Sequence, residues 1–145
     1  MNQMEGQVPN IDMKVAFIGD CRSGKSALLK TFGGNEEGLK PYVPTEIEGF
    51  AATYGEGESK KTISITDVTG KGDLKPMRML TLIDVDCIVI CFALNDDTTL
   101  TRACTEWVDE AKKYAPKDIP LILCGCKSDL RDINECKGEL KGIVQ

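Results

Sequence analysis

The sequence predicts a three-layer α/β/α fold in which helices cover both faces of a mainly parallel sheet. Two wholly apolar runs, 87–93 and 121–124, are typical of strands that are buried on both faces. Between them, apolar residues recur at helical spacing from Leu100 to Tyr114, which indicates an amphipathic helix facing the core. Strands that alternate with helices in this way pair in parallel through right-handed crossovers.

The first half of the chain supplies the remaining strands. The apolar run Val15–Ile18 predicts a strand, and good helix formers begin at Ala27. Residues 32–38 have the composition of a loop. The runs 46–54 and 62–68 flank a turn at 55–59, so we expect two strands there, one of them an antiparallel edge strand.

The second half adds helices. Residues 76–82 predict a short helix rich in Met and Leu, and Pro116 and Pro120 end the long amphipathic helix. Weak periodicity over 131–145 predicts a marginal helix. The polar residues 1–12 are expected to form a flexible tail, and 13–145 the single domain.

Composition and charge exclude several classes of protein. The net charge of −5 argues against nucleic acid as a partner and gives no polybasic membrane anchor. No apolar run approaches the ~20 residues of a membrane span, and no secretory signal or prenylation motif is present. Together with cysteines that lack paired spacing, these features predict a cytoplasmic protein without a membrane anchor of its own.

The seven cysteines are expected to be reduced thiols that fill the core. A zinc site at Cys124 and Cys126 is improbable, because no second pair lies nearby and the chain contains no histidine. The missing histidine also excludes Ser-His and Cys-His nucleophilic catalysis.

Residues Gly19–Ser26 match the phosphate-binding pattern G-x-x-x-x-G-K-[ST] between a predicted strand and a predicted helix. In this setting backbone N–H groups converge on an anion, Lys25 reaches the β- and γ-phosphates, and the Ser26 hydroxyl binds Mg²⁺. The motif predicts a P-loop NTPase. Two further polar loops, 67–70 and 125–129, follow predicted strands, and ligands in such sheets bind at the carboxyl ends of the strands.

These motifs together resemble those of Ras-superfamily small GTPases, and specifically the Rho family. Tyr42-Val-Pro-Thr45 is similar to the Rho switch I signature, and Asp67-x-x-Gly70 occupies the switch II position. Cys126-Lys-Ser-Asp-Leu-Arg131 resembles the guanine-specificity motif with its Rho-type extension. Trp107 and Ala115-Pro116 also match, and the resemblance covers about residues 13–140.

The resemblance implies GTP or GDP and Mg²⁺ as cofactors, and a signalling switch of the cytoskeletal or membrane-traffic type. Effector proteins would bind switch I and switch II, and an exchange factor is a possible partner. Asp129 would accept both guanine N–H donors, whereas adenine would leave its carboxylate unpaired. The implied residues are, for phosphate, Asp20, Cys21, Arg22, Ser23, Gly24, Lys25, Ser26, Ala27 and Gly70; for switch I, Tyr42, Pro44 and Thr45; for guanine, Cys126, Lys127, Asp129 and Leu130; and for metal, Ser26, Thr45 and, through water, Asp67.

Several positions depart from the family pattern. Lys71 replaces the glutamine that orients the attacking water, and Cys21 replaces a glycine of the phosphate loop, as in Rnd-like atypical members. We therefore expect weak or absent hydrolysis. The aromatic that covers the base in the family has no counterpart near Gly38 and Leu39. Because the resemblance implies a further last strand and helix, we expect an incomplete small G domain whose strand at 121–124 would be an uncovered edge. Two alternatives stay open, a competent GTPase in which a partner positions the water, and a nucleotide-poor scaffold.

Overall fold

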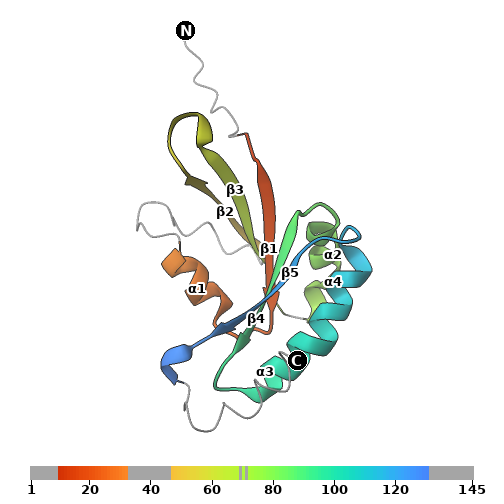
Figure 1. Cartoon of the computed structure of the whole chain (residues 1–145). Helices are drawn as coiled ribbons and strands as arrows, with labels where there is room; N and C mark the ends of the chain where they lie inside the picture. Colours follow the sequence, from red (N-terminus) through yellow and green to blue (C-terminus); the bar gives the residue numbers. More distant parts are fainter. Residues whose placement is uncertain (1–9, 33–46, 69, 71, 131–145) are drawn as a thin grey trace.

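A five-stranded sheet forms the centre of the computed structural model, which describes residues 10–32, 47–68, 70 and 72–130 (Figure 1). The strand order is β2-β3-β1-β4-β5. The strands are β1 (Met13–Gly19), β2 (Ile47–Tyr54), β3 (Lys61–Val68), β4 (Cys87–Ala93) and β5 (Leu121–Cys126).

Most neighbouring strands run in parallel, as the sequence predicts. Strand β1 pairs in parallel with β3 and β4, and β4 pairs in parallel with β5. Strand β2 pairs antiparallel with β3 alone and forms one edge of the sheet. This arrangement confirms the α/β fold with one antiparallel edge strand. It also brings the carboxyl ends of β1, β3, β4 and β5 to one rim.

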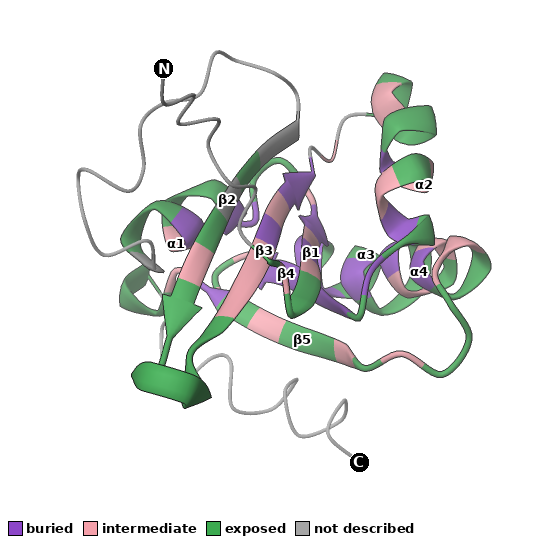
Figure 2. Cartoon of the chain, turned by 90° about the horizontal axis from the view of Figure 1, so that it is seen from above, coloured by how far each residue is buried: buried purple, intermediate pink, exposed green. Residues whose placement is uncertain are grey.

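Helices lie on both faces of the sheet (Figure 2). Helix α1 (Lys25–Phe32) lies on one face, and α2 (Lys75–Ile83), α3 (Asp97–Arg102) and α4 (Val108–Tyr114) lie on the other. Helix α3 begins where the Asp96 carboxylate accepts a hydrogen bond from the backbone N–H of Thr98 at 3.0 Å. Helix α2 has Pro76 in its first turn, where a missing N–H costs nothing.

The predicted amphipathic helix at 100–114 has a π-helical segment, Ala103–Trp107, in its middle. The Thr105 hydroxyl donates to the carbonyl of Thr101 at 2.8 Å, as the Thr31 and Thr81 hydroxyls do to carbonyls one turn earlier in the regular helices α1 and α2. Its apolar stripe packs into the core, as predicted. The stripe includes Leu100, Ala103, Trp107 and Ala111.

Each face of the sheet has its own core. The larger core, under α2, α3 and α4, includes Ile18, Val68, Ile88 and Ile90. The smaller core lies on the α1 face and contains the buried residues Val89, Cys91 and Cys126, with Phe17 and Leu28 packed against them.

Several element bounds differ by a few residues from the predictions, and two of these differences have a local reason. Helix α1 begins at Lys25 because the phosphate-loop motif leads directly into it, and β5 runs to Cys126 because its pairing with β4 continues to Ala93. The predicted loop at 32–38, apart from residue 32, and the predicted marginal helix at 131–145 lie outside the described residues. Within the described part of the chain, no helix combines the length and the apolar character needed to cross a membrane.

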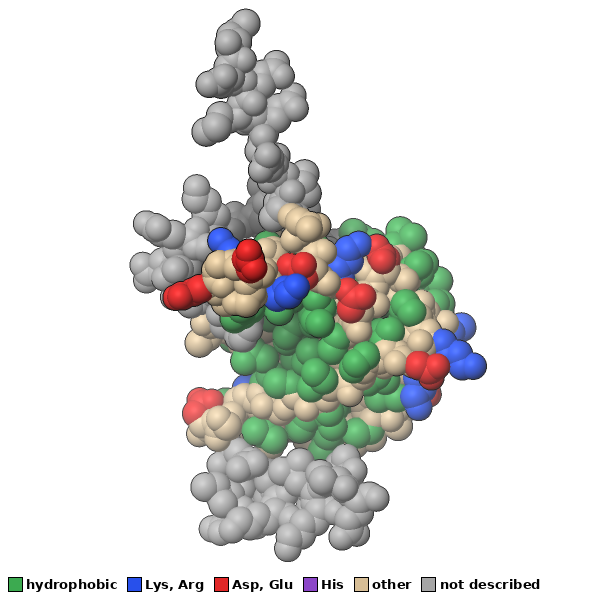
Figure 3. Space-filling model, turned by 45° about the horizontal axis from the view of Figure 1, so that its top comes forward, with side chains coloured by type: hydrophobic (Ala, Val, Ile, Leu, Met, Phe, Trp, Pro, Cys, Tyr) green, Lys and Arg blue, Asp and Glu red, His purple; other side chains and the backbone are tan. Residues whose placement is uncertain are grey.

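Strand β5 is the second edge of the sheet that the described residues form. Its side chains Ile122 and Leu123 are exposed. Figure 3 shows hydrophobic side chains gathered across the middle of one face of the molecule. The expectation that the run 121–124 is buried on both faces was therefore wrong, because β5 has a neighbouring strand on one side only among the described residues.

Candidate functional site

The loop between β1 and α1 passes too close to its neighbours to carry side chains at its two glycines. A Cβ on Gly19, whose φ is +149°, would lie 2.4 Å from the carbonyl oxygen of Cys91. Gly24 has a φ of +86°, and a Cβ there would lie 3.2 Å from both the Cβ of Cys126 and the Cγ of Lys127. The backbone of the loop therefore lies against the β4 backbone at Gly19 and against the side chains of Cys126 and Lys127 at Gly24.

Lys25 and Ser26 converge on Asp67 at the start of α1. The Lys25 ammonium forms an ion pair with the Asp67 carboxylate, and the Ser26 hydroxyl donates to Asp67 Oδ2 at 2.9 Å. Lys25 is only 5% exposed and Asp67 only 8%. The pairing follows from the topology, because the parallel register of β1 and β3 places Phe17 beside Asp67. Each buried charge therefore has a partner, as burial requires.

This group of side chains fits a nucleotide phosphate together with Mg²⁺. A buried ammonium beside a helix N-terminus favours an anion, and hydroxyl and carboxylate oxygens are the ligands that Mg²⁺ prefers. The glycines of the loop allow its backbone N–H groups to approach a phosphate without obstruction.

Gly70 packs directly on the phosphate loop. A Cβ at this position would lie 2.4 Å from the carbonyl oxygen of Gly19, 3.1 Å from the backbone nitrogen of Cys21 and 3.2 Å from Asp20 Cα. A side chain therefore cannot be accommodated at residue 70 without a shift of backbone. The segment after β3 and the phosphate loop thus meet backbone to backbone.

The segment after β5 contacts the same loop. Lys127 adopts a left-handed conformation with a φ of +62°, which is uncommon for a residue with a side chain. Its aliphatic stem lies against Gly24, and its carbonyl accepts a hydrogen bond from the Leu130 N–H at 3.0 Å. The turn Ser128–Leu130 follows, and both Asp129 and Leu130 are exposed there.

Asp20 is anchored by the helix on the far side of the loop. The indole N–H of Trp107 donates to Asp20 Oδ1 at 2.9 Å, and the Arg102 guanidinium lies 3.4 Å from the same oxygen. Sequence reasoning noted Trp107 as a family match but did not find this contact. The only available signal was that a core tryptophan needs an acceptor for its N–H.

A cavity of about 280 Å³ lies beside the anchored loop. Its lining includes Asp20, Cys21, Arg22, Gly70, Thr99 and Arg102. Cys21 and Arg22 are both exposed, so these two side chains border open space next to the phosphate loop.

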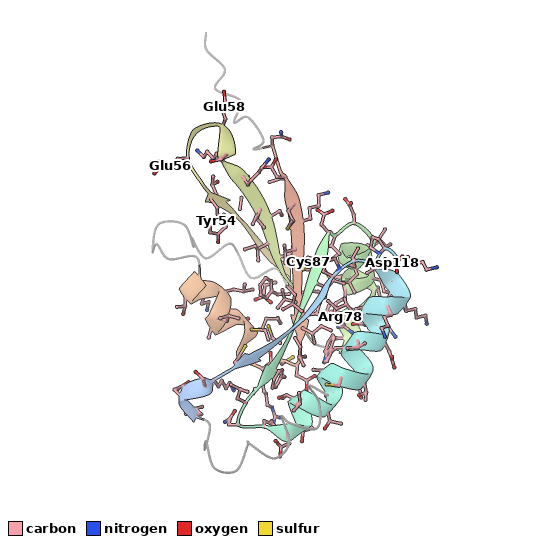
Figure 4. All side chains as sticks on the ribbon, viewed as in Figure 1. Tyr54, Glu56, Glu58, Arg78, Cys87 and Asp118 are labelled. Atoms are coloured by element: carbon pink, nitrogen blue, oxygen red, sulfur yellow. The ribbon has the colours of Figure 1, made fainter. Side chains whose placement is uncertain are left out.

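Helix α2 is tied to α4 by a buried ion pair that the sequence did not reveal. Arg78 Nε lies 3.1 Å from Glu110 Oε2, and Arg78 Nη2 lies 3.0 Å from Glu110 Oε1. The guanidinium also stacks over the Trp107 ring at 5.1 Å from its centroid. Figure 4 shows Arg78 between α2 and α4. Arg78 therefore links α2 to the residue that anchors Asp20.

The thiol of Cys126 has an altered acidity. A hydrogen bond from the Cys91 thiol lowers the pKa of Cys126 to about 7. The same hydrogen bond, and then burial, raise the pKa of Cys91 well above its ordinary value. The cysteines of the described residues are all free thiols, as predicted, but Cys21 and Cys104 are exposed and do not fill the core.

The structure brings together most of the residues that the sequence analysis assigned to phosphate. The loop from Asp20 to Ala27 lies beside Asp67, Gly70, Cys126 and Lys127 at the rim where the parallel strands end. The switch I residues Tyr42, Pro44 and Thr45, together with Lys71, lie outside the described residues. Asp129 and Leu130 lie at the same rim but are exposed.

Comparisons with known proteins agree with this arrangement. The model of the Ras family matches residues 14–141. The GTP-binding protein RHO1 of Candida albicans is 34% identical over 121 residues, which are 82% of this chain and 59% of that protein. The GTP-binding protein Rho1 of Kluyveromyces lactis is 29% identical over 143 residues, which are 97% of this chain and 67% of that protein. The chain thus spans about three fifths of the first relative.

Proposed function

Because the chain belongs to the Ras family, and its relatives are Rho proteins, we propose that it is a Rho-like molecular switch that binds GTP or GDP with Mg²⁺. The main support for this proposal is that Lys25 and Ser26 both contact Asp67 at the phosphate loop. The segments that contain Gly70 and Lys127 pack against the same loop. Lys25 would bind the phosphates with the backbone N–H groups of the loop. Ser26, Thr45 and, through water, Asp67 would hold Mg²⁺, which neutralises phosphate charge when bound.

The base would be selected by the turn after β5. Asp129 would accept from the two guanine N–H groups, and its exposure in the structure leaves the carboxylate open to a ligand. The Lys127 stem, lying against Gly24, would support both the base and the phosphate loop. Cys126 and Leu130 complete this guanine-binding segment.

Hydrolysis is proposed to be weak or absent. Lys71 carries only donors, so it cannot both donate to and accept from an attacking water as a glutamine amide does. Cys21 adds a side chain beside Gly70, where an arginine from a partner would approach. Nucleotide exchange would then determine the fraction of the protein that has GTP bound. Effector proteins would bind switch I and switch II in the cytoplasm.

A binding comparison between guanine and adenine nucleotides tests the proposal. The purified chain is titrated with fluorescent GDP and ADP in Mg²⁺ buffer, and we expect a preference for GDP on the order of 10⁴-fold. Asp129→Ala should remove that preference, whereas Lys25→Ala should abolish binding of both. Glu58→Ala is the matched control, because Glu58 is an exposed carboxylate in another short turn, far from the site (Figure 4).

The alternative outcomes separate the remaining candidates. Equal affinity for the two nucleotides would contradict the assignment of Asp129. Failure of the folded chain to bind either nucleotide would favour the nucleotide-poor scaffold. Rapid single-turnover hydrolysis with a partner present would favour the competent GTPase.

A further inference from the structure

Three cysteines from two strands form a cluster beneath the phosphate loop. Cys91 belongs to β4, and Cys124 and Cys126 belong to β5. Their three sulfur atoms lie within 4.8 Å of one another. Sequence spacing showed only the Cys124–Cys126 pair, because the third thiol comes from a strand more than thirty residues earlier.

The sheet places these thiols on one face. Cys91 and Cys124 are register partners in the parallel pair β4–β5, and neighbouring strands lie about 4.8 Å apart. Cys126 follows Cys124 by two residues, so its side chain points to the same face. This is the α1 face, where Val89, Phe17 and Leu28 pack around the cluster.

We propose that Cys91, Cys124 and Cys126 bind a thiophilic metal ion, Cu⁺ or Zn²⁺, through all three sulfurs. When three atoms lie within 4.8 Å of one another, some point lies within about 2.8 Å of all of them. Each sulfur then needs to move by roughly 0.5 Å to reach the 2.3 Å of a typical Zn–S bond. Thiolate ligands select Cu⁺ and Zn²⁺ over Mg²⁺, so the cluster does not compete for the metal of the nucleotide site.

The surroundings support a bound cation. Cys91 and Cys126 are buried, which excludes water, whereas Cys124 is only half buried and gives the ion a way in from the β5 side. No fourth Cys, Asp or Glu of the described residues joins the cluster. Three thiolates suffice for Cu⁺, and Zn²⁺ would take a solvent molecule as its fourth ligand.

Anaerobic titration of the full chain with Cu⁺, and separately with Zn²⁺, tests this site. Each metal competes with a chromophoric chelator, and sulfur-to-metal charge-transfer absorbance reports thiolate coordination. Two variants separate the cluster from the other cysteines. In one, Cys21, Cys87, Cys104 and Cys136 are changed to Ala; in the other, Cys124 alone is changed to Ala.

We expect one equivalent of at least one of the two metals to bind to the wild type and to the variant that keeps only the cluster. Cys124→Ala should weaken that binding more than roughly 100-fold, since loss of a ligand exceeds the 10- to 100-fold effect of outer-shell partners. Cys87→Ala is the matched control, because Cys87 is also a buried thiol on β4 but lies at the opposite end of the strand (Figure 4). Its metal affinity should equal that of the wild type.

Two results would overturn the site. One is a folded cluster-only variant that binds neither Cu⁺ nor Zn²⁺ more tightly than the Cys124→Ala variant does. The other is an equal loss of affinity in Cys87→Ala and Cys124→Ala. Circular dichroism of each variant shows whether it is folded. The titration contains no nucleotide, so its outcome does not depend on the proposed switch function.

Discussion

Replacing Glu110 by alanine should destabilise the protein far more than replacing a surface glutamate of the same helix. The change leaves the Arg78 guanidinium without its bidentate carboxylate partner, and both side chains are nearly inaccessible, at 5% and 9% exposure. Breaking a buried pair on one side costs about 3–5 kcal/mol of unfolding free energy. That loss is a large fraction of the roughly 5–15 kcal/mol by which domains are stable.

Glu106→Ala provides the comparison. Glu106 pairs with Arg102 one turn away at 2.9 Å, but these side chains are 64% and 44% exposed. An exposed pair at this spacing contributes only about 0.3–0.5 kcal/mol. The double change Arg78→Met with Glu110→Leu removes both buried charges together, so its cost should fall well below that of Glu110→Ala.

Urea unfolding followed by circular dichroism measures all three variants under one buffer condition. If Glu110→Ala costs no more than Glu106→Ala, the buried pair does not hold α2 against α4. If the double variant is less stable than Glu110→Ala, the packing of the two stems matters more than their charges, and the electrostatic reasoning is wrong.

Three further predictions concern the nucleotide and the phosphate loop. Single-turnover phosphate release should be faster in Lys71→Gln than in the wild type, and faster still with Cys21→Gly added; a wild type that matches the double variant would contradict this. A fluorescent GDP analogue should dissociate in minutes rather than many hours, because the sequence has Gly38 or Leu39 where the family has an aromatic that covers the base. Trp107→Phe should lower the unfolding free energy by about 1.5–3 kcal/mol, because Asp20 loses a hydrogen bond to its carboxylate; unchanged stability would refute that role.

Strand β4 was predictable because burial on both faces leaves a simple apolar run, whereas the same pattern at 121–124 gave a wrong expectation of burial for β5. The run 87–93 coincides with β4, in which every residue is buried. The interruption of the long helix at 103–107 was not predictable from periodicity.

The residues of the candidate site also fall into two groups, those that the sequence predicts and those that it does not. Sequence motifs with a characteristic spacing contain Lys25, Ser26 and Asp67. These residues can therefore be predicted from the sequence alone. Pairs that form across the fold carry no such signal. Arg78 and Glu110 are 32 residues apart in the sequence. Each of them, taken alone, is a charged residue of the kind usually found on the exposed face of a helix. Their burial becomes evident only when α2 and α4 are packed together.

Trp107 connects these two parts of the molecule. Its indole N–H donates a hydrogen bond to the Asp20 carboxylate of the phosphate loop, and the Arg78 guanidinium of α2 stacks over its ring. Gly70, shortly before α2, packs on the backbone of the same loop. A displacement of α2 that withdrew Arg78 would remove the cation from the ring and leave Glu110 with an unpaired buried charge, which is costly. The position of α2 and the hydrogen bond to Asp20 therefore involve the same aromatic side chain.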